Sequence, residues 1–171
     1  MSRAFVKEDS SAPPLVVPRA PLPEGVPNYV TARGLALLRA ERALLDAARP
    51  HPDSAEGASA VAAHNARLAA LEERIARAIL LDPKTLPHDE ARFSALVRLR
   101  SEAGEQRAYR IVGVDEADAQ SGRIAFTAPL ALQLSGKRVG DHVSLRGAEG
   151  RADFAIVAID YAPEAEPPDE P

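Results

Sequence analysis

The fold of the second half of this chain is decided by the stretch Tyr109-Arg110-Ile111-Val112-Gly113-Val114-Asp115-Glu116-Ala117-Asp118. Two more blocks follow it in order, Arg123-Ile124-Ala125-Phe126-Thr127-Ala128-Pro129-Leu130 and Gly136-Lys137-Arg138-Val139-Gly140-Asp141. Apolar and polar residues alternate in the first block and at the start of the second, which predicts two strands. Proline is favoured at the first position of a helix, so Pro129 predicts a short helix over 130–134.

Further strands are predicted on both sides of these blocks. The same alternation marks the runs 95–101, 108–114, 123–127, 141–146 and 152–161. Glycines at positions 104, 122, 140 and 150 are typical of turns between strands. We therefore expect one antiparallel sheet, with the short helix covering one of its faces.

The region before the sheet has the periodicity of helices. Thr31 is a suitable N-cap, and Leu35, Leu38 and Leu45 follow it at spacings of three and seven residues. A second helical run, 60–80, has apolar residues at alternating spacings of three and four, which are Val61, His64, Leu68, Leu71, Ile75 and Ala78. Each helix can bury its apolar residues by packing them against those of the other, which predicts an antiparallel helical hairpin of coiled-coil type.

Proline-rich ends complete the domain organisation. Residues 1–29 contain six prolines and no periodicity, and residues 163–171 are acidic and rich in proline. Both compositions predict disordered tails. The expected regions are thus a tail at 1–29, a hairpin at 30–81, a sheet domain at 82–162 and a tail at 163–171.

Composition excludes several classes of function. The chain has no cysteine, so disulfides, thiolate metal sites and thiol nucleophiles are excluded. A net charge of −4 argues against nucleic-acid binding driven by a global positive field. The start of the chain lacks the pattern of a signal sequence, and no run reaches about 18 apolar residues. We expect a cytoplasmic protein without membrane contact.

Taken in order, the three blocks resemble the C-terminal domain of the bacterial GreA/GreB transcript cleavage factors. A weaker resemblance continues to Tyr29-Val30-Thr31-Ala32-Arg33-Gly34-Leu35, which is similar to the start of this family's first helix. The resemblance implies an α+β fold, with an N-terminal antiparallel helical hairpin followed by a small FKBP-like antiparallel β-sheet domain and a short helix. It also implies a partner, RNA polymerase, to which this protein is an accessory factor without an active site of its own.

By the same resemblance, the sheet domain lies on the rim of the polymerase secondary channel and the hairpin enters the channel. The family carries two carboxylates at the hairpin tip that help to position Mg²⁺ in the polymerase active site, where backtracked RNA is cleaved. Asp53 and Glu56 match this pair in spacing, which makes them the candidate catalytic and metal-positioning residues. No cofactor other than this shared Mg²⁺ is expected.

The letters around the pair depart from the family pattern, however. The chain reads Pro52-Asp53-Ser54-Ala55-Glu56-Gly57-Ala58, where the family resembles Gly-Asp-Leu-x-Glu-Asn-Ala. The first helix also looks about three turns shorter than in full-length members, or ~16 Å. Ordinary solvated loop acids are therefore the alternative for Asp53 and Glu56.

Three arginines of the second helix are candidates for contact with nascent RNA. Arg67, Arg74 and Arg77 fall roughly on one flank by helical periodicity, and the family uses a basic patch on its hairpin for this purpose. Pairing with neighbouring glutamates within the helices is the alternative.

Attachment to the polymerase is expected at the short helix. Pro129, Leu130 and Lys137 match the family's docking segment, with a purely structural role as the alternative. The acidic residues between the first two blocks are expected to form a solvated turn, and they are Asp115, Glu116 and Asp118.

Three functions remain open at this point. The first is a polymerase-binding elongation factor, expected to be monomeric, that stimulates RNA cleavage through the secondary channel and touches nascent RNA and template DNA only within the elongation complex. The alternative is a non-cleaving Gre-like or Rnk-like regulator that occupies the same channel. The third is a peptidyl-prolyl isomerase, suggested by fold analogy alone, which would need an aromatic-lined apolar pocket that so few aromatics seldom form.

Overall fold

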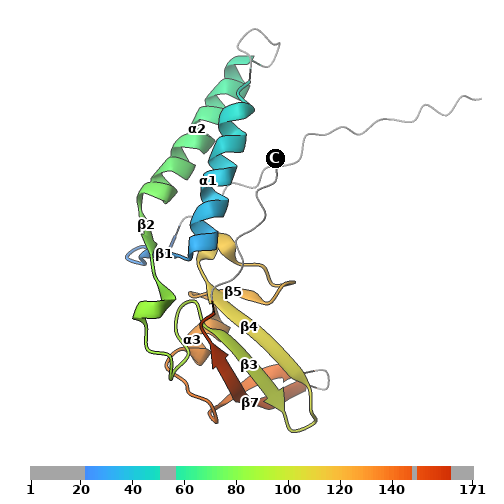
Figure 1. The fold of residues 1–171 in the computed structure, drawn as a ribbon. Coiled ribbons are helices and arrows are strands. Elements are labelled where there is room, and N and C mark those ends of the chain that lie inside the picture. Colours follow the sequence, from blue (N-terminus) through green and yellow to red (C-terminus); the bar gives the residue numbers. More distant parts are fainter. Residues whose placement is uncertain (1–21, 51–56, 148–149, 163–171) are drawn as a thin grey trace, which may run out of the picture.

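The computed structural model describes residues 22–50, 57–147 and 150–162 of this α+β protein. A helical hairpin rises from one end of a β-sheet domain (Figure 1). The hairpin part contains β1 (Asn28–Val30), α1 (Ala32–Ala47), α2 (Gly57–Ala76) and β2 (Ala78–Leu80). The sheet part contains η1 (Pro83–Thr85), β3 (Leu96–Ser101), β4 (Gln106–Val112), η2 (Val114–Glu116), β5 (Arg123–Ala125), α3 (Pro129–Leu134), β6 (His142–Gly147) and β7 (Gly150–Asp160).

The leucine stripes of α1 and α2 hold the hairpin together. Leu38 of α1 and Leu71 of α2 are each 2% exposed, and Leu45 is buried with them. At the start of α1, the Thr31 hydroxyl accepts a hydrogen bond from the Gly34 N–H at 2.9 Å, as an N-cap does. The predicted antiparallel hairpin is confirmed, and the two helices lie side by side in Figure 1.

A short parallel pair of strands closes the base of the hairpin. β1 and β2 pair in register from Asn28 opposite Ala78 to Val30 opposite Leu80. Two predicted boundaries were therefore wrong: the tail expected to run to residue 29 overlaps β1, and the helix expected to run to residue 80 ends at Ala76. Backbone pairing across the base satisfies amides and carbonyls that the end of a helix would leave open.

The main sheet has the strand order β5-β4-β3-β7-β6. Three of its pairings are antiparallel, but β4 and β5 are parallel, with Arg110 opposite Arg123. The prediction of an entirely antiparallel sheet was therefore wrong at this edge. Instead of a tight hairpin, residues 113–122 carry the chain back along β4, passing η2 on the way.

The inner face of this sheet forms the second hydrophobic core. Val97, Leu99 and Phe154 are at most 1% exposed, and α3 packs onto them through Ala131 and Leu134. The predicted short helix over one face is confirmed. In the described part of the chain, no helix combines the length and hydropathy required to cross a membrane.

Candidate functional site

An apolar surface lies at α3 and the loop that follows it. Leu132 is 63% exposed and Val139 is 59% exposed, although both side chains are apolar. Leu132 also lines a cavity of about 370 Å³ whose other walls include Leu86, Phe93 and Phe126. Exposed apolar side chains beside an apolar hollow are typical of surfaces that bind another protein.

Aromatic rings gather in this cavity where the two parts of the molecule meet. The rings of Tyr29, Phe93 and Phe126 lie 5.6–5.9 Å apart, centroid to centroid, in tilted and edge-on arrangements. Tyr29 comes from β1, whereas Phe93 and Phe126 come from the sheet domain. The low aromatic content of the sequence therefore did not prevent an aromatic-lined pocket, because three of the seven Tyr and Phe residues converge here.

The three residues predicted to attach the protein differ in their exposure. Pro129 is exposed at the first position of α3, but Leu130 is partly buried and packs against the sheet core. Lys137 is half-buried, and its backbone carbonyl accepts a hydrogen bond from the Ala91 N–H at 2.7 Å. Sequence reasoning missed Leu132 and Val139. A signal was present, since α3 reads Pro-Leu-Ala-Leu-Gln-Leu and holds more leucine than one buried face requires.

A second candidate region is the junction between the hairpin and the sheet domain, where η2 packs against the start of α1. Glu116 is 4% exposed, and its two carboxylate oxygens lie 2.6 and 2.7 Å from the Thr31 hydroxyl. Arg33 forms an ion pair with the same carboxylate at 3.7 Å. The prediction of a solvated turn was wrong for Glu116, because its carboxylate is buried and accepts a hydrogen bond from the N-cap residue of α1.

The side chain of Asp115 is also buried, and it pairs with the second helix. The distance from Arg74 Nε to Asp115 Oδ2 is 3.4 Å, and the two side chains are 8% and 6% exposed. The side-chain amide of Asn28 donates a hydrogen bond to the Arg74 carbonyl at 2.8 Å. Only Asp118 of the acidic group is exposed as predicted, and a hydrogen bond from the Ser121 hydroxyl lowers the pKa of Asp118.

Two glycines allow this junction to close. A Cβ atom added to Gly113 would lie 2.7 Å from the Tyr29 carbonyl oxygen, and one added to Gly34 would lie 2.6 Å from Glu116 Oε2. Gly113 needs glycine because the opposing atom belongs to the backbone, whereas a side chain at position 34 would force the Glu116 carboxylate to move. The hairpin therefore leaves the sheet domain in an orientation set by buried polar contacts and backbone packing.

The chain is similar in sequence to known proteins over most of its length. The family model "Transcription elongation factor, GreA/GreB, C-term" matches residues 86–161. The chain is 36% identical over 126 residues to the transcription elongation factor GreA of a Nitratiruptor species, covering 70% of this chain and 77% of that protein. It is 40% identical over 121 residues to GreA of Acidiphilium cryptum, covering 67% and 77%. The chain belongs to the GreA/GreB family.

A solved structure also matches this GreA/GreB family member. The prokaryotic transcription elongation factor GreA/GreB from Nitrosomonas europaea is 21% identical, with a TM-score of 0.41, and the match covers 78% of this chain and 98% of that one. The family assignment rests on the sequence relatives, whose matches cover 67–70% of this chain.

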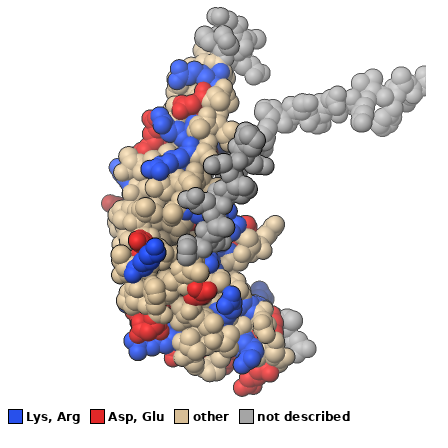
Figure 2. Space-filling view, viewed as in Figure 1, with Lys and Arg blue, Asp and Glu red and all other residues tan. Residues whose placement is uncertain are grey.

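The arginines of the GreA/GreB hairpin do not form one free patch. Arg74 is buried against Asp115, so its side chain does not reach the solvent where RNA would lie. Arg67 pairs across the hairpin with Glu41 at 3.5 Å, and Arg77 pairs with Glu73 at 2.8 Å. Figure 2 shows the resulting mixture of basic and acidic side chains along the hairpin. Only Arg77 pairs with a glutamate of its own helix, as the alternative from sequence expected. Arg67 pairs across the hairpin, and Arg74 pairs with an aspartate of the sheet domain.

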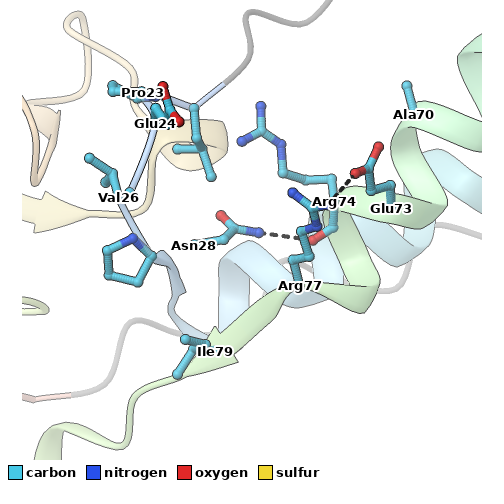
Figure 3. Close-up of a pocket in the computed structure, with 12 residues that line it drawn as sticks. Pro23, Glu24, Val26, Asn28, Ala70, Glu73, Arg74, Arg77 and Ile79 are labelled. Carbon is cyan, nitrogen blue, oxygen red and sulfur yellow. Dashed lines mark hydrogen bonds and ion pairs between the residues drawn. The ribbon is translucent and has the colours of Figure 1, made fainter.

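Next to these arginines lies a second cavity, between residues 22–28 and α2. It has a volume of about 510 Å³, and Figure 3 shows Arg77 and Glu73 on the helix side facing Pro23 and Val26. Ile79 lines it and is 46% exposed. The segment leading into β1 thus packs along the second helix near the base of the hairpin.

The predicted tip pair, Asp53 and Glu56, lies outside the described residues. The described helices end at Ala47 and begin again at Gly57, so the pair belongs to the connection between the two arms. Elsewhere in the described chain, no group of three or more His, Asp or Glu side chains is arranged to hold a metal ion.

Proposed function

We propose that this protein is a transcription elongation factor that binds RNA polymerase and acts through the polymerase secondary channel. Family membership supports this function, since its relatives carry the name transcription elongation factor. The observation that carries the mechanism is the junction, where Thr31 and Arg74 of the hairpin meet the buried Glu116 and Asp115. A hairpin held in this way has a fixed orientation to the sheet domain. Its tip is therefore placed at a defined position when the sheet domain binds the polymerase.

The dimensions of the hairpin suit a narrow channel. α1 has 16 residues and α2 has 20, which correspond to about 24 and 30 Å at ~1.5 Å per residue. Two helices packed about 8–10 Å apart form a slender rod. In our proposal the apolar surface at Leu132 and Val139 attaches the sheet domain to the polymerase, and the rod carries the tip inwards.

At the tip, Asp53 and Glu56 would supply carboxylate oxygens to the Mg²⁺ of the polymerase active site. Hard oxygen ligands suit this ion, which also keeps water and phosphate in its coordination shell. Under this proposal the factor needs neither a metal nor an active site of its own, acts as a monomer, and contacts nascent RNA through Arg67 and Arg77 within the elongation complex.

The second candidate is a regulator that enters the channel without stimulating cleavage. The shortened first arm expected from the sequence favours it, and α1 has 16 residues. The departure of the tip letters from the family pattern favours it as well. A carboxylate misplaced by about 1 Å can lower a rate by roughly 10²-fold, so a small change in reach separates the two functions.

Two measurements test these proposals. Purified RNA polymerase is first captured with the tagged full-length chain, and failure to bind would overturn both functions. Cleavage of RNA in stalled elongation complexes is then followed with wild-type protein, Asp53→Ala and Glu56→Ala. Cleavage that is lost in both variants while polymerase binding persists supports the metal role. Cleavage of equal rate in all three proteins contradicts that role, and binding without any cleavage identifies the regulator.

A further inference from the structure

The face of the main sheet that points away from α3 is basic. We call it the outer sheet face, and its residues alternate along each strand with the buried core residues such as Val97, Leu99 and Phe154. Among its described residues, six arginines stand beside two aspartates, Asp153 and Asp160. The arginines are Arg98, Arg100, Arg110, Arg123, Arg146 and Arg151. This excess stands out because the whole chain has a net charge of −4.

Four of these arginines are exposed and make no ion pair within the residues that the structure describes, and they are Arg98, Arg100, Arg146 and Arg151. This differs from the hairpin, where Arg42, Arg67 and Arg77 all pair with acids. Arginines left without acidic partners on a soluble surface concentrate positive potential there. The local charge of the outer sheet face is therefore not neutralised by the arrangement of the fold.

Strand pairing sets the spacing of these charges. Arg98 and Arg100 are two residues apart on β3, which places them about 6.6 Å apart on the same face. Arg146 stands directly opposite Arg151 at the end of the β6–β7 pair. Ala155 lies between them, as the strand partner of both Arg100 and His142. Its short side chain does not project from the sheet as the arginines do. The arginines can thus reach past this small side chain toward one extended partner.

We propose that the outer sheet face binds the phosphate backbone of duplex DNA. Guanidinium groups pair with phosphates through charge-assisted hydrogen bonds, and such contacts need no base sequence. The described outer sheet face bears no Phe, Tyr or Trp side chain, because Tyr109 and Phe154 point to the core. Surfaces that bind single strands rely on aromatic stacking, so the face fits a double-stranded backbone better than a single strand. This inference goes beyond the proposed function, since it involves neither the hairpin tip nor the apolar surface.

The test measures binding of the full-length chain to a fluorescent duplex of random sequence by anisotropy, without polymerase. At physiological salt we expect weak binding, with a Kd of about 10⁻⁴–10⁻⁶ M, that tightens as the salt concentration is lowered. Arg98→Ala with Arg100→Ala should weaken binding about tenfold and reduce the slope of log K against log salt by about 1.8, since each phosphate contact contributes about 0.9. Arg146→Ala with Arg151→Ala should have a similar effect.

The matched control removes the same charge elsewhere. Lys84 and Arg138 are exposed and lie in η1 and in the loop after α3, so the double variant Lys84→Ala with Arg138→Ala should bind DNA like the wild type. Equal weakening in the control would overturn the proposal, because it would show a net-charge effect. An unchanged salt slope in the arginine variants, tighter binding to a single strand of equal length, or equal displacement by polyglutamate would overturn it as well. Thermal unfolding verifies that all variants are folded.

Discussion

The carboxylate of Glu116 lies 2.6 Å from the hydroxyl of Thr31, 85 residues earlier in the chain, and this contact joins the sheet domain to the N-cap residue of α1. The same hydroxyl caps α1 by accepting a hydrogen bond from the Gly34 N–H. One side chain therefore both starts the helix and ties it to η2. The direction in which the hairpin points depends on a short, partly buried polar contact.

Gly34→Ala tests how tightly Glu116 is held. Alanine in place of a helical glycine ordinarily stabilises a protein by about 1 kcal/mol. Here the new methyl group would lie 2.6 Å from Glu116 Oε2, so we expect the free energy of unfolding to fall instead. In a Glu116→Ala background the collision is absent, and the same substitution should be stabilising. Urea unfolding of the four proteins measures the sign of both steps, and a stabilising Gly34→Ala in the native background would contradict the packing described here.

Arg74→Ala and Arg77→Ala form a matched pair on one helix. Arg74 is 8% exposed and pairs with the buried Asp115, whereas the Arg77 side chain is 76% exposed. Removing one partner of a buried ion pair leaves the other charge uncompensated, so Arg74→Ala should cost about 3 kcal/mol of stability. Arg77→Ala should change stability by less than about 0.5 kcal/mol. Chemical denaturation compares the two, and an equal effect would show that the Asp115 contact contributes little.

Leu132→Asp tests the apolar surface. Leu132 is 63% exposed, so the substitution should leave folding intact, but a charge in an apolar interface should weaken polymerase binding more than about tenfold. Leu80 is 53% exposed on β2 and lies outside this surface, which makes Leu80→Asp the matched control. Capture of purified polymerase at several concentrations measures both, and wild-type binding by Leu132→Asp would place the attachment elsewhere.

Tyr161 makes the stability of the sheet domain sensitive to high pH. Its hydroxyl donates to the Glu90 carbonyl at 2.6 Å and accepts from the Arg92 N–H at 3.0 Å, and burial raises the pKa of Tyr161. A raised pKa in the folded state favours the neutral phenol. This contribution to stability is complete below the unfolded pKa of about 10 and is lost as pH rises through the folded value.

We therefore expect the free energy of unfolding to decrease above about pH 10, and to decrease less steeply in Tyr161→Phe. At neutral pH the variant should be less stable by about 1 kcal/mol, because it leaves the two backbone groups without their partner. Denaturation at a series of pH values measures both effects. A Tyr161→Phe profile parallel to the wild type would refute the role of this phenol.

Local patterns in the sequence determined the elements of this protein. The leucine spacing after Thr31 predicted α1, the alternation around Val97 and Ile111 predicted β3 and β4, and Pro129 predicted α3. These signals succeed because helix and strand periodicity is imposed by the face that each element buries. The three ordered blocks also indicated the family, which the relatives confirm.

Only the tertiary structure decided what the acidic segment does. Asp115 and Glu116 look like turn residues in sequence, since nothing near them in the chain predicts burial. They are buried because residues 113–122 cross the base of the hairpin, where Thr31 and Arg74 supply partners from far away in the chain. The parallel pairing of β5 and the gathering of arginines on one sheet face have the same origin. Such features depend on which segments meet in space, and that depends on the packing of the whole chain rather than on the periodicity of any one segment.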